Sequence, residues 1–530
     1  MKTMRLYDRV NPIDLELFKN RFSSIAEEMG VVLQRTSYSP NIKERKDFSC
    51  AIFDKKGEMV AQALHIPVHL GSMSWAVKSA ISDIELKQGD MIILNDPFRG
   101  GTHLPDITLI APVFYEKELC FFVANRAHHA DIGGMSAGSM PISKNIFQEG
   151  LIIPPVKLLK GGRPQKDLLD MILRNVRTPE EREGDLEAQI MANIVGQKRI
   201  KELIRKEGRD KVNTYASALI EYAERHMRSL IKKIPDGEYE FEDFLDDDGA
   251  GNEKIRIKCV LRIKDDVAEV DLSNSDEQTE GCINSVYGVV VSAVLYVFRA
   301  LLEEDIPANS GCIRPIKVIT KKGTVVDAEF PSAVAGGNVE TSQRIVDALL
   351  GALSKALPDR IPAASQGTMN NISIGGIDPR SGKHFAYYET IAGGMGASAK
   401  GDGENAIQCH MTNTMNTPVE ALEYAYPIMV TEYRIRRGSG GHGRYKGGDG
   451  VVKELMLLCD AEVTVMSERR KFPPYGLYGG MPGKKGINTI IADGKEIKCA
   501  GKFSLSLKEG SRLRIETPGG GGFQSPNKEH

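Results

Sequence analysis

The sequence predicts an α+β fold, a multi-layer mixed α/β enzyme subunit with a β-rich C-terminal section. Three observations predict it. A long amphipathic helical stripe lies near the N-terminus, at Pro12–Thr36. Short apolar runs bounded by Gly, Pro, Asp or charge, which are typical of strands, alternate with further helical stretches. The last hundred or so residues hold only short runs of this kind.

The first helix is predicted from both its start and its periodicity. Asn11 can cap it, Pro12 suits its first turn, and apolar residues then recur at three- and four-residue steps. The other predicted helices are Ser72–Ser82, Asp167–Arg174, Thr178–Lys233 with a break near Gly208, Asn284–Glu303 and Thr341–Leu357.

The predicted strands are spread along the chain and dominate its end. They are Phe48–Phe53, Met59–Ala63, Met91–Leu94, Ile107–Val113, Cys120–Ala124, Gly237–Phe244, Ile255–Ile263, Ala268–Ser273, Ile316–Ile319, Thr324–Ala328, Ala386–Ile391, Tyr433–Ile435, Val451–Leu458, Glu462–Ser467, Asn488–Ala492 and Arg512–Thr517. This order predicts four regions: an α+β region at 1–160, a helical region at 161–235, a central α+β region at 236–430 and a β-rich region at 431–530.

The composition excludes several classes of partner. A net charge of −2 over 530 residues gives no electrostatic case for nucleic acid or an anionic membrane. No apolar run reaches the ~18 residues of a membrane span. The N-terminus lacks the apolar core of a signal peptide. Eight cysteines without paired spacing favour reduced thiols, so a cytoplasmic location is expected.

The candidate metal-binding and catalytic side chains are concentrated in residues 89–134. His103 and Asp106 precede one predicted strand, and His128 follows the next. If the two strands form a hairpin, the start of the first meets the end of the second, which brings these residues together beside His128 or His129. Two imidazoles and one carboxylate can hold Zn, Mn or Fe and leave positions open for water and substrate.

Other polar residues lie near the same strand ends. Asp96, His129 and Asp131 belong to this group, while His65 and His69 could support the pocket, contact substrate, or simply lie in the core or on the surface. The residues alone leave a plainer alternative open, because a histidine pair near a turn can arise by chance.

Three further features of the sequence bear on ligand binding. Asn338, Glu340 and Thr341 stand where a loop meets a helix start, which suits either an anionic oxygen or simple capping. The acidic turn Asp246–Asp248 can bind a cation or be a solvated turn, and the second is favoured. No glycine-rich run has the lysine of a P-loop at its spacing, so no nucleotide site of a known kind is predicted.

Several motifs carry a resemblance. NDPFRGGTHLPDI, ANRAHHADIGG, GGNVETSQRIVDAL, YRIRRGSGGHGRYKGGDG and ETPGGGGF occur in this order along the chain. Together they resemble the hydantoinase B / 5-oxoprolinase family. That family includes the B subunits of ATP-dependent N-methylhydantoinases, the C-terminal half of 5-oxoprolinases, and subunits of acetone and acetophenone carboxylases.

The resemblance implies a function. It places the metal ligands at His103, Asp106 and His128. Beside them, our own hypothesis assigns His129 or Asp131 as general base or orienting group and Asp96 as a supporting residue. The chain would be the metal-bearing B subunit of an ATP-dependent cyclic amidohydrolase that opens a hydantoin, N-methylhydantoin, 5-oxoproline or lactam ring. A hydantoinase A-type partner would bind ATP and phosphorylate the substrate, so a hetero-oligomer is expected.

Two alternatives remain. The first is a subunit of an ATP-dependent ketone carboxylase of the acetone or acetophenone type, which keeps the metal and changes the reaction. The second is a non-catalytic scaffold that only stabilises its A-type partner; such a scaffold would not need the His–Asp–His set.

Overall fold

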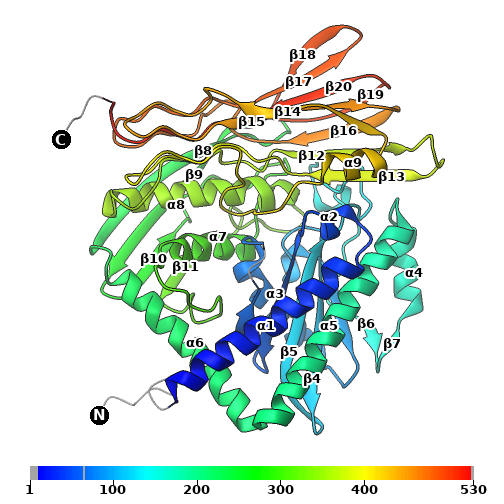
Figure 1. The fold of residues 1–530 in the computed structure, drawn as a ribbon, viewed down its shortest axis with the longest axis vertical. Coiled ribbons are helices and arrows are strands. Elements are labelled where there is room, and N and C mark those ends of the chain that lie inside the picture. Colours follow the sequence, from blue (N-terminus) through cyan, green and yellow to red (C-terminus); the bar gives the residue numbers. More distant parts are fainter. Residues whose placement is uncertain (1–9, 64–65, 527–530) are drawn as a thin grey trace.

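The computed structural model describes residues 10–63 and 66–526 and has the predicted α+β class (Figure 1). Helices cover two sheets in the lower part of the molecule, and two further sheets are stacked above them. Within the described residues, no helix is both long and apolar enough to cross a membrane.

The N-terminal sheet is antiparallel, with seven strands in the order β2-β1-β5-β4-β3-β6-β7. Its strands are β1 (Phe48–Asp54), β2 (Met59–Gln62), β3 (Met91–Leu94), β4 (Asp106–Tyr115), β5 (Glu118–His128), β6 (Val156–Lys160) and β7 (Arg163–Pro164). Alternate side chains of β5 face opposite sides. Phe121 packs in the core under helices α1 and α5, whereas Phe122 packs in the separate cluster under α3.

The helices on this sheet are α1 (Pro12–Thr36), α2 (Pro40–Lys43), α3 (His69–Asp83), α4 (Lys166–Arg174), α5 (Pro179–Glu207) and α6 (Arg209–Ile231). The Asn11 side chain accepts a hydrogen bond from the backbone N–H of Ile13 and caps α1, as predicted. Gly196 lets α1 and α5 approach closely, because a Cβ there would lie 2.4 Å from Sδ of Met29. The predicted break in the long helical region lies at Gly208, between α5 and α6, where φ is +84°.

A second sheet has the order β11-β10-β9-β8. Its strands are β8 (Gly237–Asp247), β9 (Glu253–Lys264), β10 (Val267–Asp271) and β11 (Ile316–Ile319). Helix α8 (Ser342–Ala356) packs on β8 and β9, and the buried helix α7 (Tyr287–Ala300) lies between α3 and α8.

The predicted strand Thr324–Ala328 is wrong. The segment forms turns, with only isolated bridges at Thr324. Its backbone is satisfied by loops instead of a sheet: Val325 donates to the carbonyl oxygen of Asp276 and its own carbonyl accepts from Ser285. An apolar run of this length can therefore be buried without joining a sheet.

The upper part of the molecule is built from two sheets, ordered β13-β12-β16-β19 and β14-β15-β20-β17-β18. Their strands are β12 (Asn371–Ile377), β13 (His384–Glu389), β14 (Ile428–Arg436), β15 (Gly450–Leu457), β16 (Ala461–Met466), β17 (Ile487–Ala492), β18 (Lys495–Cys499), β19 (Lys502–Leu507) and β20 (Arg512–Glu516), with the short helix α9 (Val419–Ala425) before β14. Both sheets contribute to one core, in which Ile374 and Val463 join Leu455 and Leu513.

The strand β12 was missed because two glycines interrupt its apolar pattern. Gly375 is required by a close approach, since a Cβ there would lie 2.1 Å from the Cβ of Ala137. Strands from both sides of residue 430 share this sheet. The division into four regions stays a prediction.

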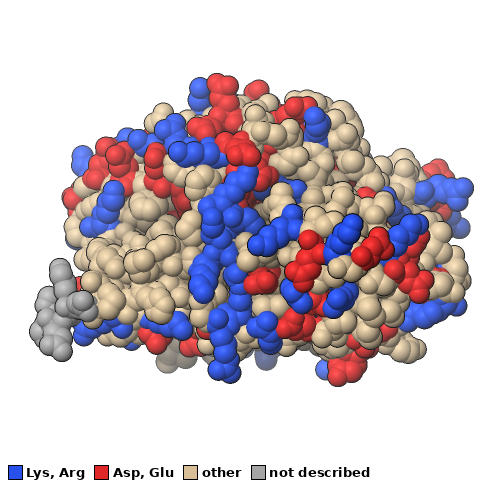
Figure 2. Space-filling model, turned by 90° about the horizontal axis from the view of Figure 1, so that it is seen from above, with Lys and Arg blue, Asp and Glu red and all other residues tan. Residues whose placement is uncertain are grey.

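Lysines and arginines gather in a band across the face seen from above, beside acidic side chains (Figure 2). In the five-stranded sheet, Arg512 and Arg514 of β20 form ion pairs of 3.0 and 2.8 Å with Glu454 of β15. This local balance of charge agrees with the small net charge of the chain.

Candidate metal centre

His103, Asp106 and His128 converge at one end of the β4–β5 hairpin. The strand register pairs Asp106 directly with His128. The Nδ1 atoms of His103 and His128 lie 3.1 and 3.3 Å from the two oxygens of the Asp106 carboxylate. One potential ligand atom from each residue falls in a group with no separation above 4.8 Å, and all three side chains are buried.

Asp106 is oriented by neighbours beyond the two histidines. Its Oδ2 accepts a 2.7 Å hydrogen bond from the Thr102 hydroxyl and lies 3.2 Å from Nε2 of His69, the first residue of α3. The other ring nitrogen of His69 lies 2.9 Å from the Ser49 hydroxyl of β1. His69 is therefore a supporting residue of the triad, whereas His65 lies outside the described residues.

His128 packs against an aromatic side chain from the upper sheets. The Tyr388 ring of β13 stacks on its imidazole, with 4.6 Å between centroids. The Tyr388 hydroxyl donates to Oδ1 of Asn371, whose amide donates to Glu340. This chain of contacts holds the Tyr388 ring against the imidazole of His128.

Asn338 reaches the same site from the π-helical turn Gly337–Thr341 that precedes α8. Its Nδ2 lies 3.5 Å from Nε2 of His103, and its Oδ1 is buried without a hydrogen-bond partner. Thr341 in the same turn donates to the carbonyl oxygen of Ile283. The turn thus presents Asn338 to the triad and is itself held by backbone contacts.

The pKa shifts of Asp106 and His128 favour the forms of these two side chains that bind a metal. Burial alone would raise the pKa of Asp106, but the His103 and His69 rings and the hydrogen bonds from His103 and His128 hold that pKa well below its usual range. Burial lowers the pKa of His128, which favours the neutral imidazole. An ionised carboxylate and neutral imidazoles are the forms that bind a metal.

The residues fit a divalent transition metal. The Nε2 of His128 is buried without a hydrogen-bond partner, so it is available as a ligand atom. A cavity of about 20 Å³, bordered by Asp47, Asp106 and His128 among others, has room for one ion or water. Two nitrogens and one carboxylate, without cysteine, match the donor sets of open Zn, Mn or Fe sites.

The remaining predicted site residues point elsewhere, and His129 is the clearest case. Its Nε2 lies 2.9 Å from Oε1 of Gln189 on α5, under the opposite face of the sheet from α3. Burial and the neighbouring Arg182 lower the pKa of His129 to about 4. The general-base role for His129 stays a prediction, and this contact gives it no support.

Asp131 and Asp96 have partners of their own. Asp131 accepts hydrogen bonds from the backbone N–H and the guanidinium of Arg177. Asp96 accepts from the backbone N–H of Phe98 and caps the short 3₁₀ turn Pro97–Arg99. Their proposed roles in the reaction likewise stay predictions.

Carboxylates of the acidic turn Asp246–Asp248 accept hydrogen bonds from backbone N–H groups. Asp248 accepts from the N–H groups of Ala250 and Asn252, and Asp246 accepts from those of Arg470 and Phe472. Across the described residues, His103, Asp106 and His128 form the only group with metal-ligand geometry. The favoured prediction of a solvated turn is wrong, because Asp246 and Asp248 are buried and their carboxylates accept hydrogen bonds from backbone N–H groups.

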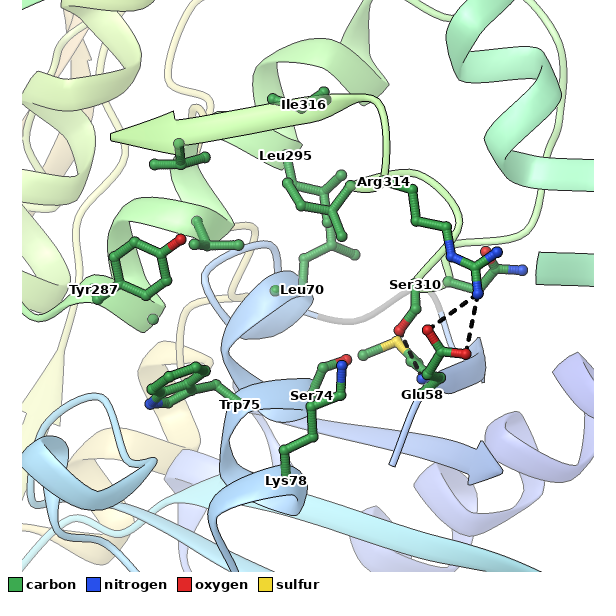
Figure 3. A pocket seen from close by; sticks show the side chains of 17 residues that line it. Glu58, Leu70, Ser74, Trp75, Lys78, Tyr287, Leu295, Ser310, Arg314 and Ile316 are labelled. Carbon is green, nitrogen blue, oxygen red and sulfur yellow. Dashed lines mark hydrogen bonds and ion pairs between the residues drawn. The ribbon is translucent and has the colours of Figure 1, made fainter. Parts of the chain in front are cut away.

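A larger cavity of about 310 Å³ lies on the other side of α3 (Figure 3). It is lined by Trp75 and Tyr287 and by aliphatic side chains, and Glu58 and Arg314 form an ion pair at its edge. Among the residues that the structure describes, its lining includes neither histidine nor cysteine. Helix α3 borders both places, with His69 on the side of the triad.

The comparison with protein families gives a direct result. The family model described as Hydantoinase B/oxoprolinase matches residues 11–526. The chain belongs to this family, as the motifs predicted.

Three relatives match almost the whole of this chain but differ in how much of their own length is matched. An uncharacterised protein of Methanocaldococcus jannaschii is 43% identical, over 98% of this chain and 91% of its own length. The 5-oxoprolinase of Dictyostelium discoideum is 40% identical, over 98% of this chain but only 41% of its own length. A Pseudomonas protein, named for the B component of a D-/L-hydantoinase, is 31% identical, over 98% of this chain and 90% of its own.

Two solved structures share the fold. The ATP-dependent caprolactamase of Pseudomonas jessenii has a TM-score of 0.91 and 32% identity, covering 98% of this chain and 92% of its own. A nucleotide-free acetone carboxylase has a TM-score of 0.92 and 21% identity, covering 100% of this chain and 78% of its own. At that identity the second likeness concerns the fold alone.

Proposed function

We propose that this chain is the metal-bearing B-type subunit of a cytoplasmic, ATP-dependent enzyme that opens a cyclic amide ring. The observation that carries the proposal is the buried convergence of His103, Asp106 and His128. The names of the relatives support the substrate class, since they include a 5-oxoprolinase, a hydantoinase component and a caprolactamase. The proposed substrates are hydantoins, 5-oxoproline or lactams.

The chemistry follows from the donor set. His103, Asp106 and His128 would hold a divalent Zn, Mn or Fe ion, which when bound would act as a Lewis acid on the ring carbonyl and on a water molecule. Thr102 and His69 orient the Asp106 carboxylate, and Tyr388 orients the His128 ring. Burial excludes bulk water, which strengthens the electrostatic effect of these groups.

ATP would be used by a partner. Ring amides are stable to hydrolysis, so activation by phosphorylation is expected, yet no glycine-rich run here has a P-loop lysine. This chain corresponds to 41% of the 5-oxoprolinase. A separate A-type subunit that resembles the rest of that polypeptide would supply the ATP site, and the two would form a hetero-oligomer.

Metal analysis tests the proposal first. The purified chain is expected to contain about one transition-metal ion, and His103→Ala, Asp106→Ala or His128→Ala should each lose it while the far-ultraviolet circular dichroism stays unchanged. His129→Ala is the matched control and should keep the metal. A metal-free wild-type chain, together with full activity of His103→Ala in the complex, would support a scaffold instead.

The reaction is then tested in the complex. The chain is co-expressed with a hydantoinase A-type protein, and ATP consumption is measured with hydantoins, 5-oxoproline, lactams and ketones. Ring opening coupled to ATP is expected. Bicarbonate-dependent turnover of a ketone would assign the carboxylase alternative, and ring opening by this chain alone would contradict the two-subunit proposal.

A further inference from the structure

Three phenylalanines from distant segments form an aromatic triplet on the surface: Phe98, Phe147 and Phe330. The Phe330 ring meets the other two edge to face, with 5.6 Å between centroids in both cases. Phe147 is 63% exposed and Phe330 is 53% exposed, whereas Phe98 is partly buried against the core. Large apolar side chains gathered in this way on a surface are typical of protein–protein contacts.

The backbone beneath the aromatic triplet is held in place. Asp96 caps the turn that carries Phe98. The N–H of Ile146 donates to the carbonyl oxygen of Pro331, which ties the Phe147 segment to the Phe330 segment. A surface ordered before binding loses less conformational entropy when a partner docks.

The same segments continue into the candidate metal centre. The Phe98 turn leads directly to Thr102 and His103. Two residues after Phe147, the buried Glu149 carboxylate accepts from the N–H groups of Val334 and Ala335, at the start of the stretch that reaches Asn338. A protein docked on the aromatic triplet would therefore rest on the loops that present His103 and Asn338.

We infer that the aromatic triplet is the docking surface for the A-type subunit. The inference rests on the proposed function, which requires a partner that delivers an activated substrate. It is argued from the relatives: the Dictyostelium 5-oxoprolinase carries a region similar to this whole chain within a much longer polypeptide. The rest of that polypeptide is joined to this region in one chain, and a contact beside the metal centre would shorten the path of the substrate.

The test uses the full chain co-expressed with its A-type partner. Phe147→Ala and Phe330→Ala are combined in one variant, and the affinity between the two proteins is measured by surface plasmon resonance. The affinity of the double variant is expected to fall by about tenfold or more, as it does when aromatic anchors are truncated. Metal content and thermal midpoint should not change, because both rings are largely exposed.

Tyr424→Ala is the matched control, since Tyr424 is an aromatic residue on α9 that is 88% exposed and lies outside the aromatic triplet. Its affinity for the A-type partner should equal that of the wild type. Equal affinity of the double variant would overturn the inference and leave the proposed function standing. Failure of the wild-type chain to bind any A-type protein would overturn both. Loss of self-association by the double variant, with partner binding intact, would assign the surface to a second copy of this chain and also overturn the inference.

Discussion

The Asp106 carboxylate uses its two oxygens differently. Oδ2 faces Thr102, His69 and His103, whereas Oδ1 faces His128. A carboxylate held by this many donors can be buried because each polar atom is satisfied. The same contacts fix its orientation toward the space between the two histidines.

Glu340 is a second buried carboxyl at the edge of this site, and its ionisation should affect stability. Burial and the nearby Glu468 raise the pKa of Glu340 to about 8, against the opposing effects of Thr368 and Lys502. In the unfolded chain the pKa is about 4.3. The contribution of this group to stability is therefore complete below about pH 4.3 and is lost as the pH rises through about 8.

Glu340→Gln should remove this dependence, because the amide keeps the acceptor oxygen used by Met369 and Asn371 and cannot ionise. The thermal midpoint of the variant relative to the wild type is expected to increase between pH 5 and pH 9, as measured by scanning calorimetry. The exposed Glu420→Gln controls for the loss of one charge. A difference that stays constant with pH would contradict the prediction.

At the scale of elements, α1 illustrates how a helix is specified. Its buried stripe includes Phe18 and Phe22, and the Phe18 ring stacks on Tyr215 of α6 at 4.6 Å. Phe22 is fully buried, with its ring centroid 6.0 Å from that of Phe121 in β5. The apolar stripe therefore joins the helix to both the sheet and a second helix.

Phe22→Ala should lower the free energy of unfolding by about 3–5 kcal/mol, because it removes buried apolar surface and leaves a cavity. Urea denaturation followed by circular dichroism measures the change. Leu17→Ala on the same helix is the control, since Leu17 is 46% exposed and should cost much less. Equal losses for the two variants would show that α1 does not pack as described.

At the scale of the whole molecule, a buried ionic network joins the upper sheets to the layer below. The guanidinium of Arg469, which follows β16, lies 2.7 Å from Asp243 of β8 and 2.5 Å from Asp347 of α8. Arg344 of α8 contacts the same two carboxylates at 3.1 Å. Two guanidinium groups and two carboxylates thus neutralise one another in the interior.

Arg469→Met should destabilise the protein by about 3–5 kcal/mol, because two buried carboxylates would each lose a partner. The measurement is equilibrium unfolding in guanidinium chloride, monitored by circular dichroism. Arg434→Met removes an arginine whose pair with Glu432 is exposed, and it should cost less than about 1 kcal/mol. A small effect of Arg469→Met would contradict a stabilising role of this ionic network between the two layers.

A structural feature was predicted correctly where the residues that determine it lie close together in the sequence. The bounds of α1 and the pairing of β4 with β5 were predicted because capping, periodicity and turn chemistry all lie within the segments themselves, although β5 extends beyond the predicted Cys120–Ala124 to His128. The strand β12 was missed because Gly375 is explained only by the distant Ala137. Tyr388 was missed as a partner of His128 because no spacing links residues so far apart in the chain.

The sequence by itself determined the α+β class, most helices and strands, the family, and the meeting of His103 and Asp106 with the pair His128–His129; it left open which histidine of that pair joins them. These features depend on residue type and on short-range order, which a chain carries before it folds. Only the tertiary structure decided that His69, Asn338 and Tyr388 surround the triad, that His129 faces α5, and that three phenylalanines meet on the surface. Those contacts join segments distant in sequence, and packing alone selects them.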